Sequence, residues 1–112
     1  MSTRHCLALD LKDNPALIAE YKKYHQAENV WPEITDSIKS SGIEQAEIFL
    51  VGNRLVMILE VSDNFSFEAK QAADLSNPKV VEWEALMGTF QQQLPWSTGD
   101  EKWLLMDKIF TL

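Results

Sequence analysis

The order of strand-like and helix-like segments in this sequence predicts an α+β fold of the form β-α-β-β-α-β. Three observations support it: apolar residues alternate near both ends of the chain, two regions show helical spacing, and a Gly-Asn turn joins two strand-like runs. This order is typical of a ferredoxin-like sandwich, in which four antiparallel strands carry helices on one face. With 112 residues, the chain is expected to form a single domain over residues 1–112.

The first strand and the first helix are predicted from the N-terminal quarter of the chain. Residues 5–11, "HCLALDL", alternate in the strand manner. Asn14 is expected to cap a helix that has Pro15 at its first position. That helix carries Tyr21 and His25, four residues apart, on one side.

A second helix and a hairpin are predicted next. Pro32 disfavours helical geometry in the residue before it and is expected to open a helix over residues 32–41, which Gly42 terminates. Residues 46–51 and 54–61 then form a β-hairpin around the Gly-Asn turn.

The C-terminal half repeats the pattern of a broken helical region followed by a strand. A helix capped near Asn64 precedes a second one that begins at the Asn77-Pro78 pair. Residues 94–101 are predicted as a loop, and residues 102–112 as the final strand.

One face of such a sheet lacks helices. We expect it to hold Phe49, Met57 or their neighbours, with large side chains of the last strand such as Trp103 or Phe110. An apolar face of this size on a small domain indicates a ligand pocket, a dimer interface, or both.

Composition excludes several classes of function. The net charge of −7 argues against nucleic acid as a partner, and no apolar run is long enough for a signal peptide or a membrane span. A single cysteine, Cys6, indicates a reducing, cytoplasmic setting and most simply a buried small side chain. His5 and His25 lie too far apart for a metal motif, and the scattered glycines form no phosphate loop.

His25 is the strongest candidate for proton transfer, because an imidazole exchanges a proton near neutral pH. Tyr21 on the same side could hold a substrate hydroxyl, but both residues also suit a purely structural role on a helix face. Trp31 and Glu33 flank Pro32, where a hydrophobic staple and a favourable helix-dipole charge explain them equally well. Trp83 suits either a core position or the wall of a sugar pocket.

The spacing from Tyr21 to His25, followed by Trp31-Pro32-Glu33, resembles the L-rhamnose mutarotase family. The likeness continues through "SIKSSGIEQAEIFL", "NRLVMILEV" and the helix of Trp83, and so runs across nearly the whole chain. It implies a dimeric α+β barrel and a cofactor-free interconversion of the α and β anomers of a small neutral sugar.

On this resemblance His25 is the catalytic acid, while Tyr21 and Trp83 contact the sugar. Trp31 and Glu33 are secondary candidates, with Glu33 as a possible proton acceptor. Two departures from the rhamnose enzymes stand out and leave the sugar open between L-rhamnose and L-fucose: Ala46 replaces a tyrosine, and Glu84 replaces a second tryptophan. Two other functions also remain open, namely another dimeric-barrel enzyme, such as a monooxygenase or isomerase, and a non-catalytic dimeric ligand-binding module.

Overall fold

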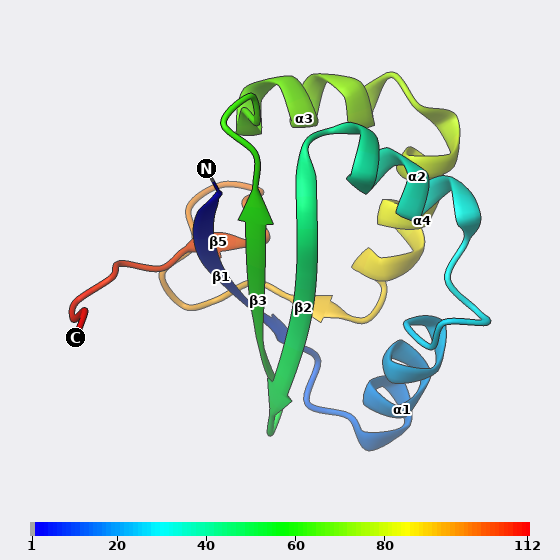
Figure 1. Ribbon diagram of the computed structural model, residues 1–112. Coiled ribbons are helices and arrows are strands. Elements are labelled where there is room, and N and C mark those ends of the chain that lie inside the picture. Colours follow the sequence, from blue (N-terminus) through cyan, green and yellow to red (C-terminus); the bar gives the residue numbers. More distant parts are fainter. Residues whose placement is uncertain (1) are drawn as a thin grey trace.

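A computed structural model describes residues 2–112 and has the predicted order of elements (Figure 1). Each helical region is divided in two, as the prolines predict. The elements are β1 (Thr3–Leu11), α1 (Pro15–Tyr24), α2 (Pro32–Ser40), β2 (Ile43–Val51), β3 (Arg54–Val61), α3 (Phe67–Leu75), α4 (Pro78–Gly88), β4 (Gln91–Gln92) and β5 (Leu104–Leu105).

The strands form one antiparallel sheet in the order β2-β3-β1-β4, and β5 also pairs with β1. This arrangement confirms the α+β, ferredoxin-like prediction. Two short strands together occupy the position of the expected fourth strand: β4 pairs with the end of β1, and β5 pairs with the middle of β1. No sequence pattern predicts β4, since two glutamines are too short to show any alternation.

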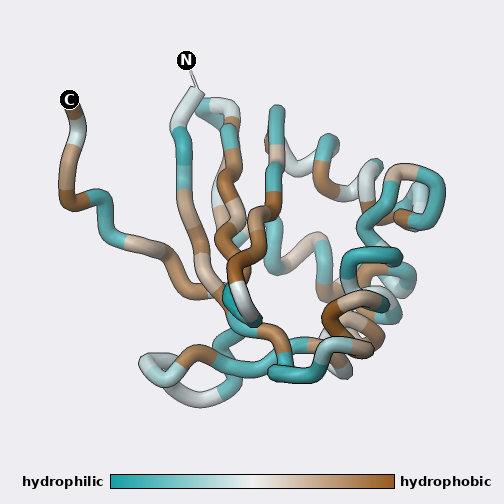
Figure 2. Tube along the Cα trace, turned by 90° about the horizontal axis from the view of Figure 1, so that it is seen from below, coloured by the Kyte–Doolittle hydropathy of each residue, from teal (hydrophilic) through white to brown (hydrophobic). Residues whose placement is uncertain are grey.

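The predicted final strand over residues 102–112 is wrong in extent. Only Leu104 and Leu105 pair with β1, and the Met106 N–H still donates to the Cys6 carbonyl at 2.8 Å. After this point the tail runs away from the sheet and ends in hydrophobic residues (Figures 1 and 2). Ile109 is 93% exposed and Phe110 75% exposed. Strand-like alternation is not sufficient here, because a strand also needs a neighbour whose backbone groups it can bond.

Side-chain caps fix where the helices begin. The Asn14 Oδ1 accepts from the backbone N–H groups of Ala16 and Leu17, at 3.0 and 3.2 Å. Asn77 caps α4 in the same manner, so both asparagine predictions are confirmed. The cap predicted near Asn64 is wrong, because Ser66 occupies the extended position and accepts from α3 instead.

The sheet has an inner face, toward the helices, and an outer face that no helix covers (Figure 1). Strand alternation and pairing assign the side chains. The inner face includes Leu7, Leu9, Leu11, Ala46, Ile48, Leu55, Met57, Leu59 and Val61. The outer face includes Cys6, Ala8, Glu47, Phe49, Val51, Val56 and Ile58.

Two side chains expected on the outer face lie elsewhere. Met57 is on the inner face, because it pairs with Ile48 and packs against the buried cluster around Leu59. Trp103 packs against the core on the same side. Phe49 does lie on the outer face and is 54% exposed. Among residues 2–112, no helix is long and apolar enough to cross a membrane.

Candidate active site

A cavity of about 390 Å³ lies between the inner face of the sheet and the helices, within the size range of small-molecule sites. Apolar side chains from the sheet, from α2 and α4 and from the segment before α3 form most of its wall. Tyr21, His25, Trp83, Glu84 and Gln91 also line it, together with the Lys70–Asp74 pair of α3. Polar groups are therefore few and lie mainly on the helical side.

The end of α1 brings Tyr21 and His25 together, as their spacing predicts. Their rings lie 4.3 Å apart between centroids, and Tyr21 is buried. His25 is the C-cap residue of α1, and its Nδ1–H donates to the Tyr21 carbonyl oxygen at 2.7 Å. A carbonyl can only accept, so the proton of neutral His25 lies on Nδ1 and Nε2 is the nitrogen left for another partner.

The surroundings shift the pKa of both side chains. Burial lowers the pKa of His25 below its usual 6.5, while the bond to the Tyr21 carbonyl opposes this in part. Burial raises the pKa of Tyr21 above its usual 10.0, a hydrogen bond from Gln91 lowers it, and the nearby charge of Glu84 raises it. Neutral imidazole and neutral phenol are thus favoured side by side.

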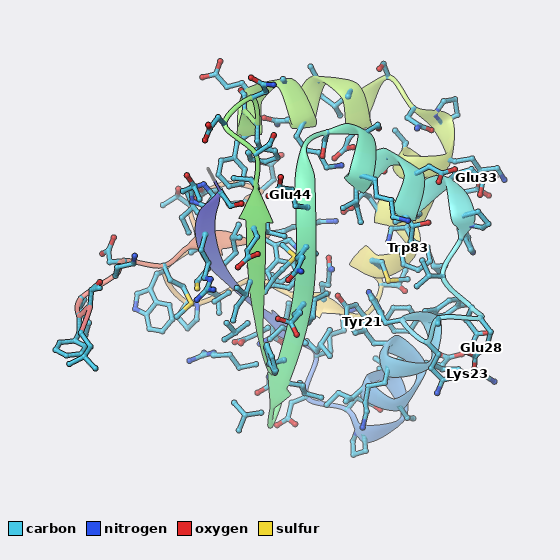
Figure 3. The ribbon with its side chains drawn as sticks, in the orientation of Figure 1. Tyr21, Lys23, Glu28, Glu33, Glu44 and Trp83 are labelled. Atoms are coloured by element: carbon cyan, nitrogen blue, oxygen red, sulfur yellow. The ribbon has the colours of Figure 1, made fainter. Side chains whose placement is uncertain are left out.

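Trp83 joins the cavity to the core. It lies on the buried side of α4 with Val80 and Met87, and its ring meets that of His25 edge-on at 5.7 Å. Figure 3 shows Trp83 and Tyr21 on the helical side of the sheet. Only 5% of Trp83 is exposed, so the indole supplies a strip of apolar wall rather than a free ring face.

The structure does not bring Trp31 and Glu33 into the cavity wall. Trp31 precedes α2 and packs edge-on against Trp83, at 5.1 Å between ring centroids. Glu33 is exposed in the first turn of α2, apart from Tyr21 in Figure 3. Neither position supports direct contact with a ligand in the cavity, and Trp31 instead supports the wall from behind.

Gln91 is a wall residue that sequence analysis missed. Its Oε1 is buried and has no hydrogen-bond partner among residues 2–112. A buried acceptor without a partner is costly unless a ligand or water satisfies it. No sequence motif predicts a role for Gln91. It becomes part of the site because β4 places it beside Tyr21.

The two departures from the rhamnose pattern, Ala46 and Glu84, both lie in the cavity wall. Ala46 is on the inner face of β2, where its small side chain leaves room that a tyrosine would fill. Glu84 lies on α4 next to Trp83. Within the described chain, no three His, Cys, Asp or Glu side chains gather in a way that would hold a metal ion.

Comparison with known proteins identifies close relatives of this chain. The family model described as L-rhamnose mutarotase matches residues 4–112. An L-fucose mutarotase of Xanthomonas campestris pv. campestris is 45% identical over 109 residues, which cover 97% of this chain and 87% of that protein. A UPF0734 protein of Dictyostelium discoideum is 39% identical over 110 residues, covering 94% and 86%.

Two solved structures share the fold. An L-rhamnose mutarotase from Formosa agariphila superposes with a TM-score of 0.70 at 20% identity, over 98% of both chains. Tetracenomycin F2 cyclase from Streptomyces glaucescens, a type-II polyketide cyclase, gives a TM-score of 0.63 at 12% identity, also over 98% of both chains. At these identities the likeness concerns the fold alone.

Proposed function

This chain belongs to the L-rhamnose mutarotase family, and from that premise we propose that it interconverts the anomers of a 6-deoxyhexose with His25 as acid. That it is a sugar mutarotase of the rhamnose or fucose type follows from the family. The identity of the sugar and the roles of individual residues are the proposal. Its main support is the position of His25, which lines the cavity with Nδ1 bound to its own helix and Nε2 free for a substrate.

Ring opening requires two proton movements. Protonated His25 Nε2 gives its proton to the ring oxygen, and the bond between that oxygen and the anomeric carbon breaks with its electron pair on the oxygen. The anomeric hydroxyl loses its proton to a base, and its oxygen forms the aldehyde C=O. Closure on the other face of the carbonyl reverses both transfers. General acid–base catalysis contributes roughly 10²- to 10⁴-fold, and the reaction needs no cofactor or metal.

Tyr21, Gln91 and Trp83 bind the sugar in this proposal. The Tyr21 hydroxyl contacts a sugar hydroxyl, and the unpaired Oε1 of Gln91 accepts from another. Trp83 lies along an apolar part of the ring. The 45% identity to an L-fucose mutarotase and the small Ala46 in the wall favour L-fucose over L-rhamnose.

The assembly that we propose is a homodimer. The outer face presents Phe49 and Val51, which are 54% and 74% exposed, and the hydrophobic end of the tail is unpaired in the single chain. Packing of two outer faces buries such side chains and produces the dimeric α+β barrel that the family resemblance implies.

The test is saturation-transfer NMR of the anomeric protons of L-fucose and L-rhamnose, with wild type and His25→Asn. We expect wild type to accelerate exchange on one sugar and His25→Asn to lose about 10²-fold or more of that acceleration. His5→Asn is the control, because His5 packs against Phe67 and does not line the cavity. Undiminished exchange in His25→Asn would refute the role of His25, and wild type inert toward both sugars would indicate a ligand-binding module instead.

A further inference from the structure

We propose that Glu84 is the second proton-transfer group of this cavity, and that it takes the proton of the anomeric hydroxyl while His25 serves the ring oxygen. The inference rests on the proposed mutarotation, and it assigns the base that this reaction needs. The position that departs most in chemistry from the rhamnose pattern would then be a working part of the reaction.

The geometry of α4 places Glu84 at the edge of the cavity. Val80, Trp83 and Met87 form the buried side of this helix, and Glu84 is one turn after Val80 and three residues before Met87. Its side chain therefore borders the buried stripe and lines the cavity. The residue as a whole remains exposed, so a sugar can approach it from solvent.

Glu84 and His25 are both neighbours of Tyr21. The His25 ring lies 4.3 Å from the Tyr21 ring, and the charge of Glu84 is near enough to raise the pKa of the Tyr21 hydroxyl. His25, Tyr21 and Glu84 all line this one cavity, so an acid and a base face the same bound ligand. A sugar held at Tyr21 would present its ring oxygen to one and its anomeric hydroxyl to the other.

The other carboxylate of the cavity wall is already engaged. Asp74 accepts a hydrogen bond from Lys70 Nζ at 2.6 Å, and both side chains of this pair are largely buried. The Lys70 ammonium thus already occupies Asp74 Oδ1, which leaves this carboxylate less accessible to a ligand. Glu84 has no such partner for its carboxylate among the described hydrogen bonds, since Lys102 Nζ reaches only its backbone oxygen, at 3.5 Å.

The charges around Glu84 act in both directions. Although residue 84 is exposed, the packed cavity wall removes part of the water around its carboxylate; this desolvation is the largest influence and raises the pKa of Glu84 above its usual 4.5, with Asp74 adding to it. Lys102 and Lys70 lower it. From α1, Tyr21 is favoured in its neutral form and His25 has a lowered pKa. The carboxylate and the imidazole are thus moved toward each other in proton affinity, which suits exchange of a proton through one substrate.

The step balances in both directions. In opening, His25 loses one proton to the ring oxygen and Glu84 gains one from the anomeric hydroxyl, while the carbon–oxygen bond of the ring breaks and the aldehyde forms. In closure, neutral Glu84 returns a proton to the aldehyde oxygen and neutral His25 removes one from the attacking hydroxyl. The enzyme ends each turnover in its starting state.

This pair should give a bell-shaped pH profile. Catalysis requires one proton on the two groups together, and that form predominates between their pKa values. Because the pKa of Glu84 is raised from 4.5 and that of His25 is lowered from 6.5, the acidic limb moves to higher pH and the alkaline limb to lower pH than these ordinary values.

The experiment measures anomeric exchange by saturation-transfer NMR for wild type, Glu84→Gln and Glu84→Asp, as a function of pH. We expect Glu84→Gln to lose about 10²-fold of the catalysed rate and the acidic limb of the profile. Glu84→Asp should keep the acidic limb at a reduced rate. Glu82→Gln is the matched control, since Glu82 lies on the same helix, outside the cavity, beside Lys79.

The outcomes separate this inference from the proposed function. If wild type and Glu84→Gln accelerate exchange equally, with the same pH profile, Glu84 is not the base although the chain is a mutarotase. If wild type accelerates neither sugar, the proposed function fails and the inference fails with it. A thermal melt of each variant identifies any loss of rate that comes from unfolding.

Discussion

The two faces of the sheet are made by the same three long strands, yet they differ in almost every respect. The inner face lies under the helices, and its leucines are nearly inaccessible, with Leu9 and Leu11 at 0% exposure. On the outer face, Phe49 and Val51 remain 54% and 74% exposed although they alternate with inner-face residues of the same strand. The chain thus provides its own cover for only one of two apolar surfaces.

Polar groups are distributed accordingly. Around the inner face they are few, and most border the cavity, where low solvent access strengthens electrostatic effects and shifts pKa values. Toward the outer face lie the Arg4–Glu60 ion pair, at 3.0 Å, and the Asp10–Arg54 ion pair, which is bidentate at 2.8 and 3.1 Å and has Trp96 over the guanidinium. The first face is suited to chemistry and the second to association.

The largest effect should come from opening a hole in the inner face. We expect Leu9→Ala to lower the free energy of unfolding by about 2–5 kcal/mol, because it leaves a void among fully buried neighbours. Urea denaturation followed by circular dichroism measures this. Leu75→Ala is the control, since Leu75 is 72% exposed and should change stability by about 0.5 kcal/mol or less. Equal losses in both variants would contradict the contrast in packing.

A charge on the outer face should have the next largest effect, on association. If two outer faces pack together, Phe49→Asp buries a carboxylate without a partner and should weaken the dimer by about 10- to 100-fold, or roughly 1.4–2.7 kcal/mol. The molar mass measured by light scattering after size exclusion should then fall from about twice the chain mass toward the chain mass. Val81→Asp, on the exposed side of α4, should not alter the mass. A monomeric wild type would contradict the proposed dimeric α+β barrel.

The smallest effect should be the pH dependence that His25 gives to stability. The pKa of His25 is lowered in the fold by burial. Just below about pH 6.5, His25 is therefore protonated in the unfolded chain but still neutral in the folded chain. Stability should therefore fall as the pH drops through this window and be unaffected above it.

Comparison of wild type with His25→Asn between about pH 7 and pH 5 isolates this contribution. The variant should lose less stability on acidification than wild type does. Glu84 acts in the opposite sense, because its raised pKa stabilises the fold as the pH falls, but it is present in both proteins and cancels. If the free energies of unfolding of the two proteins changed in parallel with pH, folding would not be linked to the protonation of His25.

Local signals made most of the fold predictable. The asparagine–proline pairs specify helix starts through groups that lie within three residues of one another, and Gly42 adopts a φ of 97° that suits glycine at the helix end. The C-terminal segment was predicted poorly because its pairing depends on a neighbouring strand and not on its own alternation.

The candidate site divides in the same way. Tyr21 and His25 were predictable because one helix turn joins them. Gln91 enters the cavity through a two-residue strand that pairs with the end of β1, far away in the sequence, so no local pattern marks it. Glu33 shows how ambiguous a local signal can be, because a carboxylate at a helix start is also explained by the helix dipole, and this one is exposed and outside the cavity wall.

The bond from the His25 ring to the Tyr21 carbonyl has a consequence for how such a domain can diversify. Both atoms belong to one turn of α1, so the direction of the imidazole is inherited with the helix and does not depend on the opposite wall. A substitution at residue 46, in the sheet wall of the cavity, can reshape the cavity without turning the imidazole. The shape of the cavity and the direction of the imidazole can therefore change independently.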